Sequence, residues 1–171
     1  FYTAANAGFN AVRIPCAWDF NATTNIIGNV TNYPISPAFM AQVKQVVDWA
    51  IDAGMYVVIN DHWGDGWLED NIGTNIDATI NAKMNSYWTQ IAAAFAGYDN
   101  HLLFAAANEP NVSSPAQMGT LMFYYQTFVN AVRGVDSNNT NRWLVLQGGG
   151  ATTWLNSLPT DPTPNRQMVE Y

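Results

Sequence analysis

The chain has 171 residues, of which 49% are hydrophobic and 11% are charged, so it is too apolar to be disordered and long enough for one globular domain. Its net charge of −7 argues against nucleic acid or any other partner that is held through its phosphates. With 13% aromatic residues and few charges, much of the surface must consist of amide, hydroxyl and aromatic groups, which suits a neutral, hydroxyl-rich ligand.

Cysteine content and hydropathy bear on whether the protein is held by disulfides or spans a membrane. Cys16 is the only cysteine, which excludes an internal disulfide, and within RIPCAW we interpret it as a small buried apolar residue. No segment approaches the roughly 20 apolar residues of a membrane span, so we expect no membrane contact. No signal-peptide pattern opens the chain. Residues 1–10 are typical of the end of a helix, and we therefore expect further sequence upstream, where a secretion signal could lie.

Five short apolar runs recur along the chain, and each is rich in Val, Ile, Leu or Met. They are apolar on both faces, as strands inside a parallel sheet are. These predicted strands are AVRIP (11–15), MYVVIN (55–60), LLFAAA (102–107), WLVLQ (143–147) and QMVEY (167–171).

Amphipathic helices are predicted between these strands. Ser36 with Pro37, and Ser114 with Pro115, are N-cap and first-turn pairs, and glycines mark the helix ends. The predicted helices cover 37–53, 77–96 and 115–133, with a shorter one over 151–158. Their Met and aromatic stripes are interpreted as core, and segments 21–33 and 64–76 as long loops.

Alternating strands and helices predict an α/β fold with a parallel sheet, which is either a doubly wound open sheet or a (β/α)8 barrel. A complete barrel usually needs about 250 residues, and only five strands are predicted here. The chain is therefore either a complete open sheet or part of a barrel, and composition does not decide between them.

In both architectures ligands bind at the carboxyl ends of the strands. At that edge, four predicted strands carry polar residues, and this coincidence favours a functional site. The residues are Arg13, then Asn60, Asp61 and His62, then Asn108 and Glu109, and finally Gln147.

The third of these strands delivers a carboxylate that is suited to acid–base chemistry. Pro110 restricts the backbone of Glu109, so the direction of the chain at the carboxylate is set. Asn108 can donate and accept hydrogen bonds, and so can hold a substrate hydroxyl beside it. Arg13 supplies a permanent charge that would keep a second carboxylate ionised.

The segments GFNAVRIP, VVINDHW, LLFAAANEP and WLVLQGGG, in this order and at these spacings, resemble strands 2 to 5 of family 5 glycoside hydrolases. That family is the large cellulase-type group of (β/α)8 TIM barrels. The resemblance covers nearly the whole chain, and it implies a partial TIM barrel of about strands 2 to 6. Residues 1–171 would then be a single incomplete catalytic domain.

The resemblance also implies roles for individual residues. Glu109 would be the acid/base catalyst of a retaining mechanism, and Asn108 would contact the sugar 2-hydroxyl. Arg13 would orient the catalytic carboxylates, and His62 would line the subsite in which the glycosidic bond breaks.

Three tryptophans are candidate sugar-binding residues. Trp18 and Trp63 stand where the family often places sugar contacts, although many relatives carry a second His in place of Trp63. Trp67 is a candidate stacking platform, because the C–H face of a pyranose packs well on an indole ring.

A retaining glycosidase needs a nucleophile about 5 Å from its acid/base, and the family places that Glu on strand 7. By this resemblance the 171 residues end within strand 6, so we expect the nucleophile beyond Tyr171 and no activity from the fragment alone. Glu170 is a weak substitute, because it is expected early in its strand, toward the far end of the barrel.

The resulting hypothesis is a secreted endo-β-1,4-glucanase of the cellulase type that acts on β-glucan polysaccharides. It would be a monomer when complete, without a cofactor or metal; the secreted location follows from the resemblance alone. A β-mannanase or xyloglucanase of the same family is the nearest alternative. From another class, the chain could be a complete open-sheet protein that binds carbohydrate without hydrolysing it.

The acidic segment that follows the second predicted strand is a candidate metal site. The cluster consists of Asp61, His62, Asp65, Glu69 and Asp70, and its carboxylates offer the oxygen ligands that hard cations accept. The spacing does not match a calcium-binding loop, because position 72 is Ile where the bidentate Glu should fall. Metal binding is therefore not expected.

Overall fold

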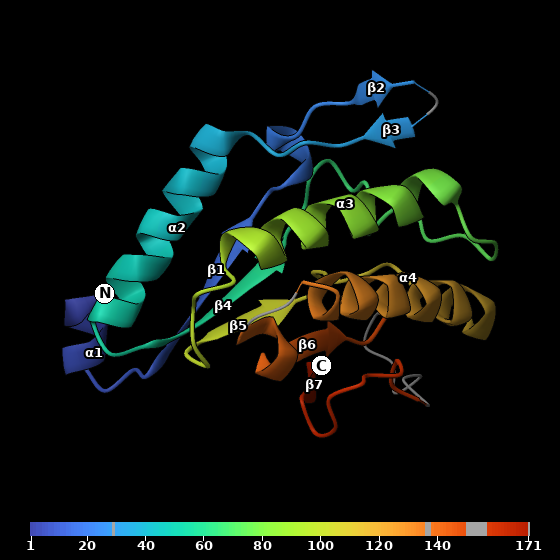
Figure 1. Ribbon diagram of the computed structural model, residues 1–171. Helices are drawn as coiled ribbons and strands as arrows, with labels where there is room; N and C mark the ends of the chain where they lie inside the picture. The colour runs from blue at the N-terminus through green and yellow to red at the C-terminus, as the bar shows by residue number, and fades with distance from the viewer. Residues whose placement is uncertain (29, 136–137, 150–156, 171) are drawn as a thin grey trace.

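The computed structural model describes all residues except 29, 136–137, 150–156 and 171. The described residues form one five-stranded sheet, a separate hairpin and a set of helices (Figure 1). The elements in chain order are α1 (Tyr2–Asn6), β1 (Ala11–Cys16), η1 (Asp19–Asn21), β2 (Asn25–Ile27), β3 (Val30–Asn32), α2 (Pro37–Asp52), β4 (Tyr56–Asp61), α3 (Ala78–Ala94), β5 (Leu102–Ala105), α4 (Pro115–Arg133), η2 (Asn138–Asn141), β6 (Leu144–Gln147) and β7 (Gln167–Glu170).

The order of the strands decides between the two architectures left open by the sequence. All pairs in the main sheet are parallel, and the spatial order β1-β4-β5-β6-β7 is the same as the order along the chain. A doubly wound sheet reverses its strand order at a switch point, whereas a barrel adds each new strand on the same side. The sheet is therefore part of a (β/α)8 barrel, as the resemblance implies.

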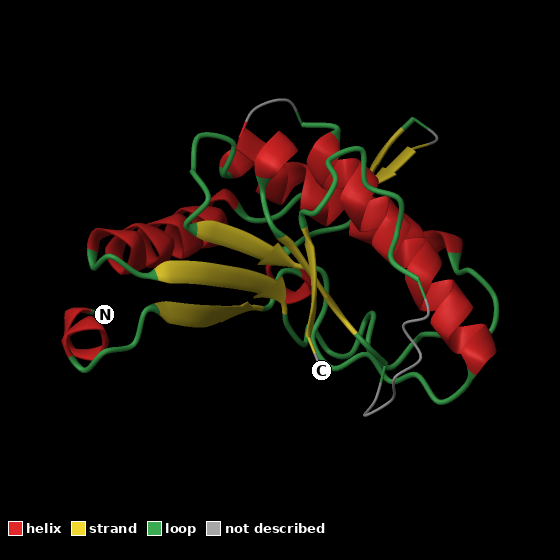
Figure 2. Ribbon diagram, turned by 90° about the horizontal axis from the view of Figure 1, so that it is seen from below, coloured by secondary structure: helices red, strands yellow, loops and turns green. Residues whose placement is uncertain are grey.

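The helices cover one face of the sheet. Figure 2 shows α2, α3 and α4 along the same side of the strands. Side chains of alternate strand residues point to that side, and Val57 and Ile59 of β4 are fully buried there in the main core. The opposite face carries a much smaller apolar cluster, built around Leu103, Ala105 and Val145. This is the face that lines the interior of a barrel.

The predicted helix starts are confirmed by their caps. The Ser36 hydroxyl accepts a hydrogen bond from the Phe39 backbone N–H at 3.5 Å, and the Ser114 hydroxyl accepts one from Gln117 at 3.2 Å. Such caps typically stabilise a helix by ~1 kcal/mol. Asp77 caps α3 in the same way, accepting from the Thr79 N–H at 2.7 Å. The helical stripes read from the sequence are core, and Cys16 is buried as expected.

One predicted loop is wrong in part. Segment 21–33 contains an antiparallel hairpin, in which Asn25 pairs with Asn32 and Ile27 with Val30. The Asn and Thr content favours a loop, but the β-branched residues on both sides of Gly28, whose φ is 64°, allow two short strands to pair. The helix predicted over 151–158 falls largely on residues 150–156, which lie outside the described part of the chain.

The helices that the structure describes bear on whether the chain could span a membrane. Within them, no helix has both the length and the apolar character that crossing a membrane would require.

Candidate active site at the carboxyl ends of the strands

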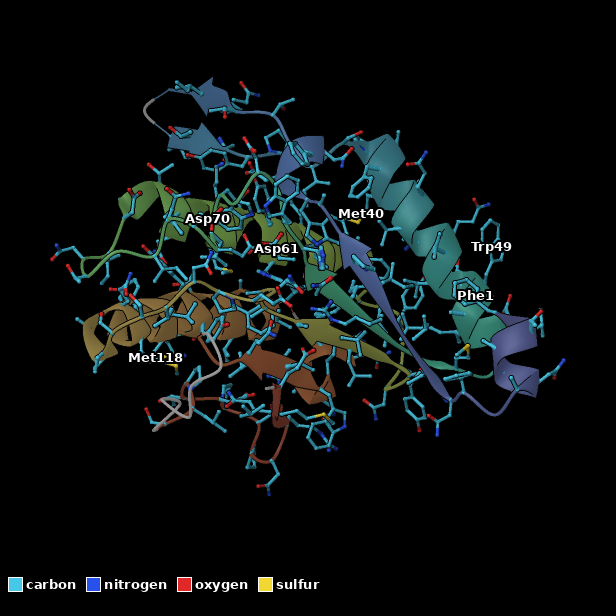
Figure 3. The ribbon with its side chains drawn as sticks, turned by 180° about the vertical axis from the view of Figure 1, so that it is seen from behind. Phe1, Met40, Trp49, Asp61, Asp70 and Met118 are labelled. Atoms are coloured by element: carbon cyan, nitrogen blue, oxygen red, sulfur yellow. The ribbon has the colours of Figure 1, made fainter. Side chains whose placement is uncertain are left out.

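The parallel strands bring the predicted polar residues to one rim. Register places Cys16 of β1 opposite Asp61 of β4, and Gln147 of β6 opposite Glu170 of β7, so these strands end at a common edge. Figure 3 shows the side chains of Asp61 and Asp70 on the side of the molecule that lies away from Phe1 and Trp49. The rim therefore gathers residues from five strands that are far apart in the sequence.

Arg13 and Asn108 meet across the inner face of the sheet. One terminal nitrogen of the Arg13 guanidinium donates a hydrogen bond to Asn108 Oδ1 at 2.7 Å, although the two residues are 95 positions apart. This bond occupies the carboxamide oxygen and leaves the Asn108 NH₂ group as a donor. An amide held in this way can donate to a substrate hydroxyl. The geometry thus supports the two roles that the resemblance implies for this pair.

Glu109 follows directly and has unusual backbone geometry. Its φ is 47°, in the left-handed region that non-glycine residues rarely adopt, at a cost of order 1–3 kcal/mol. Its backbone N–H donates to the side-chain Oε1 of Gln147 at 2.6 Å. The Glu109 side chain itself is exposed, so its carboxyl group is accessible from the rim.

His62 lies next to this group and is held in one tautomer. The Asn60 side-chain NH₂ donates to His62 Nδ1 at 3.1 Å, so the ring proton of a neutral His62 is on Nε2. Partial burial lowers the pKa of His62, and the nearby charge of Arg13 lowers it further, whereas Glu109 acts in the opposite direction. A neutral imidazole with a free Nε2–H is therefore available at neutral pH.

The three candidate tryptophans have different surroundings, and two of them are buried. Trp18 is 0% exposed, because its indole N–H donates to the Asn60 carbonyl at 3.0 Å and its ring packs against Phe39. Trp67 is 7% exposed, because its ring packs edge-on against Tyr87 at 5.5 Å. Neither ring therefore offers an exposed stacking face in this structure, and their role in sugar binding stays a prediction.

Trp63 differs from both. It is 55% exposed, and its ring meets that of Phe20 edge-on at 6.0 Å. An exposed indole at the end of β4 can stack on a sugar, so its role as a substrate-binding residue stays a prediction.

Glu170 does not lie where the sequence predicts. It is the last residue of β7, and its Oε1 is 3.9 Å from Nε of Arg13. The strand position relative to the rim depends on how far β7 slides along β6, and pattern alone does not report that slide. Glu170 therefore belongs to the rim as a charge partner of Arg13.

A second group of carboxylates is buried behind the rim. Asp61 and Glu69 are 1% and 4% exposed. Burial raises the pKa of Asp61 well above its ordinary value, and the Glu69 charge adds to the effect. Burial also raises the pKa of Glu69. Among the residues that the structure describes, no three His, Cys, Asp or Glu side chains are arranged to hold a metal ion.

Sequence reasoning missed the contacts of Gln147 and Tyr125. The sequence predicts Gln147 at the rim but no role for it; in the structure it contacts the Glu109 backbone, and its own backbone carbonyl accepts a hydrogen bond from the Tyr125 hydroxyl at 2.8 Å. Tyr125 lies on one of the helical aromatic stripes, which the sequence predicts only as core. Nothing in the local sequence signals either contact, because each joins segments at least 22 residues apart.

Comparisons with known proteins agree with this geometry. A family model described as cellulase (glycosyl hydrolase family 5) matches residues 1–170. Endoglucanase B of Ruminococcus albus is 34% identical over 92% of this chain, and the match covers 38% of that relative. A xyloglucan-specific endo-β-1,4-glucanase of Bacteroides ovatus is 36% identical over 96% of this chain, which is 34% of its own length.

Solved structures of family 5 glycoside hydrolases also match this chain. A broad-specificity GH5-4 endoglucanase from Ruminococcus champanellensis, solved with bound cellotriose, superposes with a TM-score of 0.85 at 32% identity. The superposition covers 97% of this chain and 50% of that one. The chain thus spans a third to a half of the length of these relatives. With a partial barrel, a polar rim around Glu109 and a family match from end to end, the chain belongs to glycoside hydrolase family 5.

Proposed function

We propose that the full-length protein containing this chain hydrolyses internal β-1,4-glucosidic bonds of cellulose or related β-glucans, with Glu109 as the acid/base. The observation that carries the proposal is the hydrogen bond of 2.7 Å from Arg13 to Asn108, which fixes a charged and an amide group directly beside an accessible carboxyl group. The endoglucanase relatives support the choice of bond.

The reaction would proceed with retention in two steps. Protonated Glu109 gives its proton to the glycosidic oxygen while a second carboxylate attacks the anomeric carbon and forms a glycosyl-enzyme. Glu109, now ionised, then takes a proton from the water that hydrolyses this intermediate. The second carboxylate is expected about 5 Å from Glu109, on a later strand of the full-length protein.

The neighbouring residues would act on the sugar and on the carboxylates. The NH₂ group of Asn108 would donate to the 2-hydroxyl, and the Nε2–H of His62 would be a second donor in the same subsite. Arg13 would keep the attacking carboxylate ionised through its permanent charge.

Xyloglucan is a second candidate substrate. The relative from Bacteroides ovatus that is specific for xyloglucan is as similar to this chain as the endoglucanase from Ruminococcus albus is. Initial rates on barley β-glucan, carboxymethylcellulose, xyloglucan and mannan would rank the substrates. A preference for mannan would contradict the proposed glucan specificity.

The domain organisation, location and oligomeric state of the enzyme are part of the same proposal. Residues 1–171 would form part of one catalytic domain, in a secreted and monomeric protein. A polysaccharide cannot cross a membrane, which supports an extracellular enzyme. Fractionation of producing cells tests the location, and light scattering on the purified protein tests the monomer.

Glu109→Gln in the full-length protein tests the role of the carboxyl group. We expect kcat on soluble β-glucan to fall about 10²–10⁴-fold, because the carboxamide cannot protonate the leaving oxygen, whereas substrate binding should change little. Asp65→Asn is the matched control, since Asp65 is an exposed rim-side carboxylate outside the site. Wild-type turnover in Glu109→Gln would refute the assignment.

A further inference from the structure

The backbone conformation of Glu109 needs a partner to hold it. With φ at 47°, Glu109 is in a region that its side chain disfavours, and the next residue is Pro110, which lacks a backbone N–H. The direction of the carboxyl group depends on this conformation. A residue that stabilises it would therefore affect where the acid points.

Gln147 is in contact with the backbone at this position. The regular pairing of β5 with β6 continues to the bond from the Ala106 N–H to the Val145 carbonyl, at 3.0 Å. Beyond it, the next bond between these two segments uses a side chain: Gln147 Oε1 accepts from the Glu109 N–H at 2.6 Å. The Gln147 carboxamide thus continues the hydrogen bonding between β5 and β6 as far as Glu109, which lies beyond the end of β5.

Gln147 is itself held from two sides. Its backbone carbonyl oxygen accepts a hydrogen bond from the hydroxyl of Tyr125, a fully buried residue of α4. Its other neighbour is Glu170 of β7, with which it is in register and whose carbonyl accepts from the Gly148 N–H at 3.2 Å. The backbone of Gln147, from which its side chain projects, is therefore fixed relative to the core.

The loops that follow the two strands are also pressed together. A Cβ atom on Gly149 would lie 2.3 Å from Cβ of Val112, so only glycine fits at this position. The segment after Gln147 thus touches the segment after Glu109. The distance that the carboxamide spans is set by this contact as well as by the sheet.

We infer that Gln147 is a positioning residue, which holds Glu109 in its left-handed conformation and thereby orients the carboxyl group for proton transfer. The inference rests on the proposed acid/base function of Glu109. It assigns no contact between Gln147 and the reacting atoms.

Gln147→Leu in the full-length protein removes the acceptor while keeping an apolar stem of similar length. We expect kcat on β-glucan to fall roughly 10–100-fold and KM to change less than about threefold, because displacements near 1 Å have effects of this size on a reacting group. For aryl cellobiosides whose leaving group needs no protonation, kcat/KM, which reports only the steps up to the glycosyl-enzyme, should fall much less than kcat/KM for β-glucan. A merely structural defect would slow both substrates equally.

Gln147→Glu restores the acceptor and adds a charge. It should recover most of kcat at acidic pH, where the new carboxyl group is neutral like the carboxamide that it replaces. Gln90→Leu is the matched control. Gln90 accepts from the Ile35 N–H at 2.9 Å, away from the rim, so its loss should lower the melting temperature without changing the ratio between the two substrates.

Three results would overturn the inference. The first is an equal loss for both substrates in Gln147→Leu, and the second is no loss at all. The third is a crystal structure of full-length Gln147→Leu in which Glu109 keeps a φ near 47°, whatever the activity. If the wild-type protein hydrolyses no β-glucan, the proposed function is what fails, and the crystal structure still decides whether Gln147 sets the backbone.

Discussion

Adjacent residues at the rim have different surroundings. Asn108 is half-buried and accepts a hydrogen bond from Arg13, whereas Glu109 is exposed and bent into the left-handed region. The sequence predicts both residues at the end of a strand. It does not predict the bend or its partner, because Gln147 is 38 positions away and the contact forms only when β6 pairs beside β5.

The tryptophans make the same point. Trp18, Trp63 and Trp67 follow strand ends in the sequence and are equally suitable as sugar platforms, but only Trp63 is exposed. Whether an indole faces solvent or core depends on the side chains that the helices bring against it. Phe39 and Tyr87 come from α2 and α3, and sequence position near Trp18 or Trp67 does not reveal them.

Trp63→Ala in the full-length protein should therefore weaken substrate binding. We expect KM on soluble β-glucan to rise about 3–10-fold with kcat changed less than about twofold, because stacking on an aromatic ring contributes about 0.5–1.5 kcal/mol. Trp49→Ala is the matched control, since Trp49 is 52% exposed but lies on α2, away from the rim. Equal effects of both substitutions on KM would contradict the prediction.

At the scale of single helices and strands, the ends of an element can be stabilised by a polar side chain from another part of the chain. Helix α3 ends at Ala94, and the carbonyl groups that follow are satisfied by the buried guanidinium of Arg142, just before β6. Its five hydrogen bonds run from 2.7 to 3.1 Å, to the carbonyls of Phe95, Tyr98, Asp99 and Leu102 and to the side chain of Asn139. The guanidinium also lies over the ring of Phe104, at 4.7 Å. Arg142 thus ties the end of α3 to the start of β5.

Arg142→Met should destabilise the full-length protein by about 3–5 kcal/mol, because four backbone carbonyls lose a charged donor inside the core. Urea unfolding followed by tryptophan fluorescence would measure the loss. Arg166→Met is the control: Arg166 lies over Trp143 at 5.0 Å and is only half-buried, so its removal should cost less than about 1 kcal/mol. A similar loss in both variants would contradict a specific role for Arg142.

At the scale of the whole molecule, the main core lies between the sheet and its helices, and the inner face is sparsely covered. Among the described residues, β1 and β7 each pair with one strand only, and these two edges frame the face that carries Arg13, Leu103 and Val145. This is the arrangement of consecutive strands in a barrel, and it explains why the relatives superpose so well on half of their length.

Global stability should depend on pH through the carboxylates buried behind the rim. The raised pKa values of Asp61 and Glu69 mean that the folded state binds protons more tightly than the unfolded state. Their contribution to stability is therefore fully present below about pH 4, the unfolded range, and is lost as the pH rises through the folded-state values. The charges that act on Asp61 are those of Glu69 and Asp19, which oppose its ionisation, and of Lys83, which favours it.

Asp61→Asn removes one of these ionisable groups at constant shape. Compared with the wild type, the variant should melt a few degrees higher at pH 8, and the difference should shrink toward pH 4. Calorimetry on the full-length protein at several pH values would follow the trend. Asp65→Asn, at an exposed carboxylate, should show no such dependence, and a difference for Asp61→Asn that is independent of pH would refute the explanation.

Local chemistry accounts for what the sequence determined by itself. The five strands, the three long helices with their serine caps, the parallel sheet and the placement of Glu109 at a strand end all follow from apolar runs, capping residues and glycines that act over a few positions. The pairing order β1-β4-β5-β6-β7, which separates a barrel from an open sheet, and the contacts of Gln147, Glu170 and Trp18 were decided only by the tertiary structure. The physical reason is that each of these depends on the register and curvature of the assembled sheet, which bring together side chains that no local pattern links.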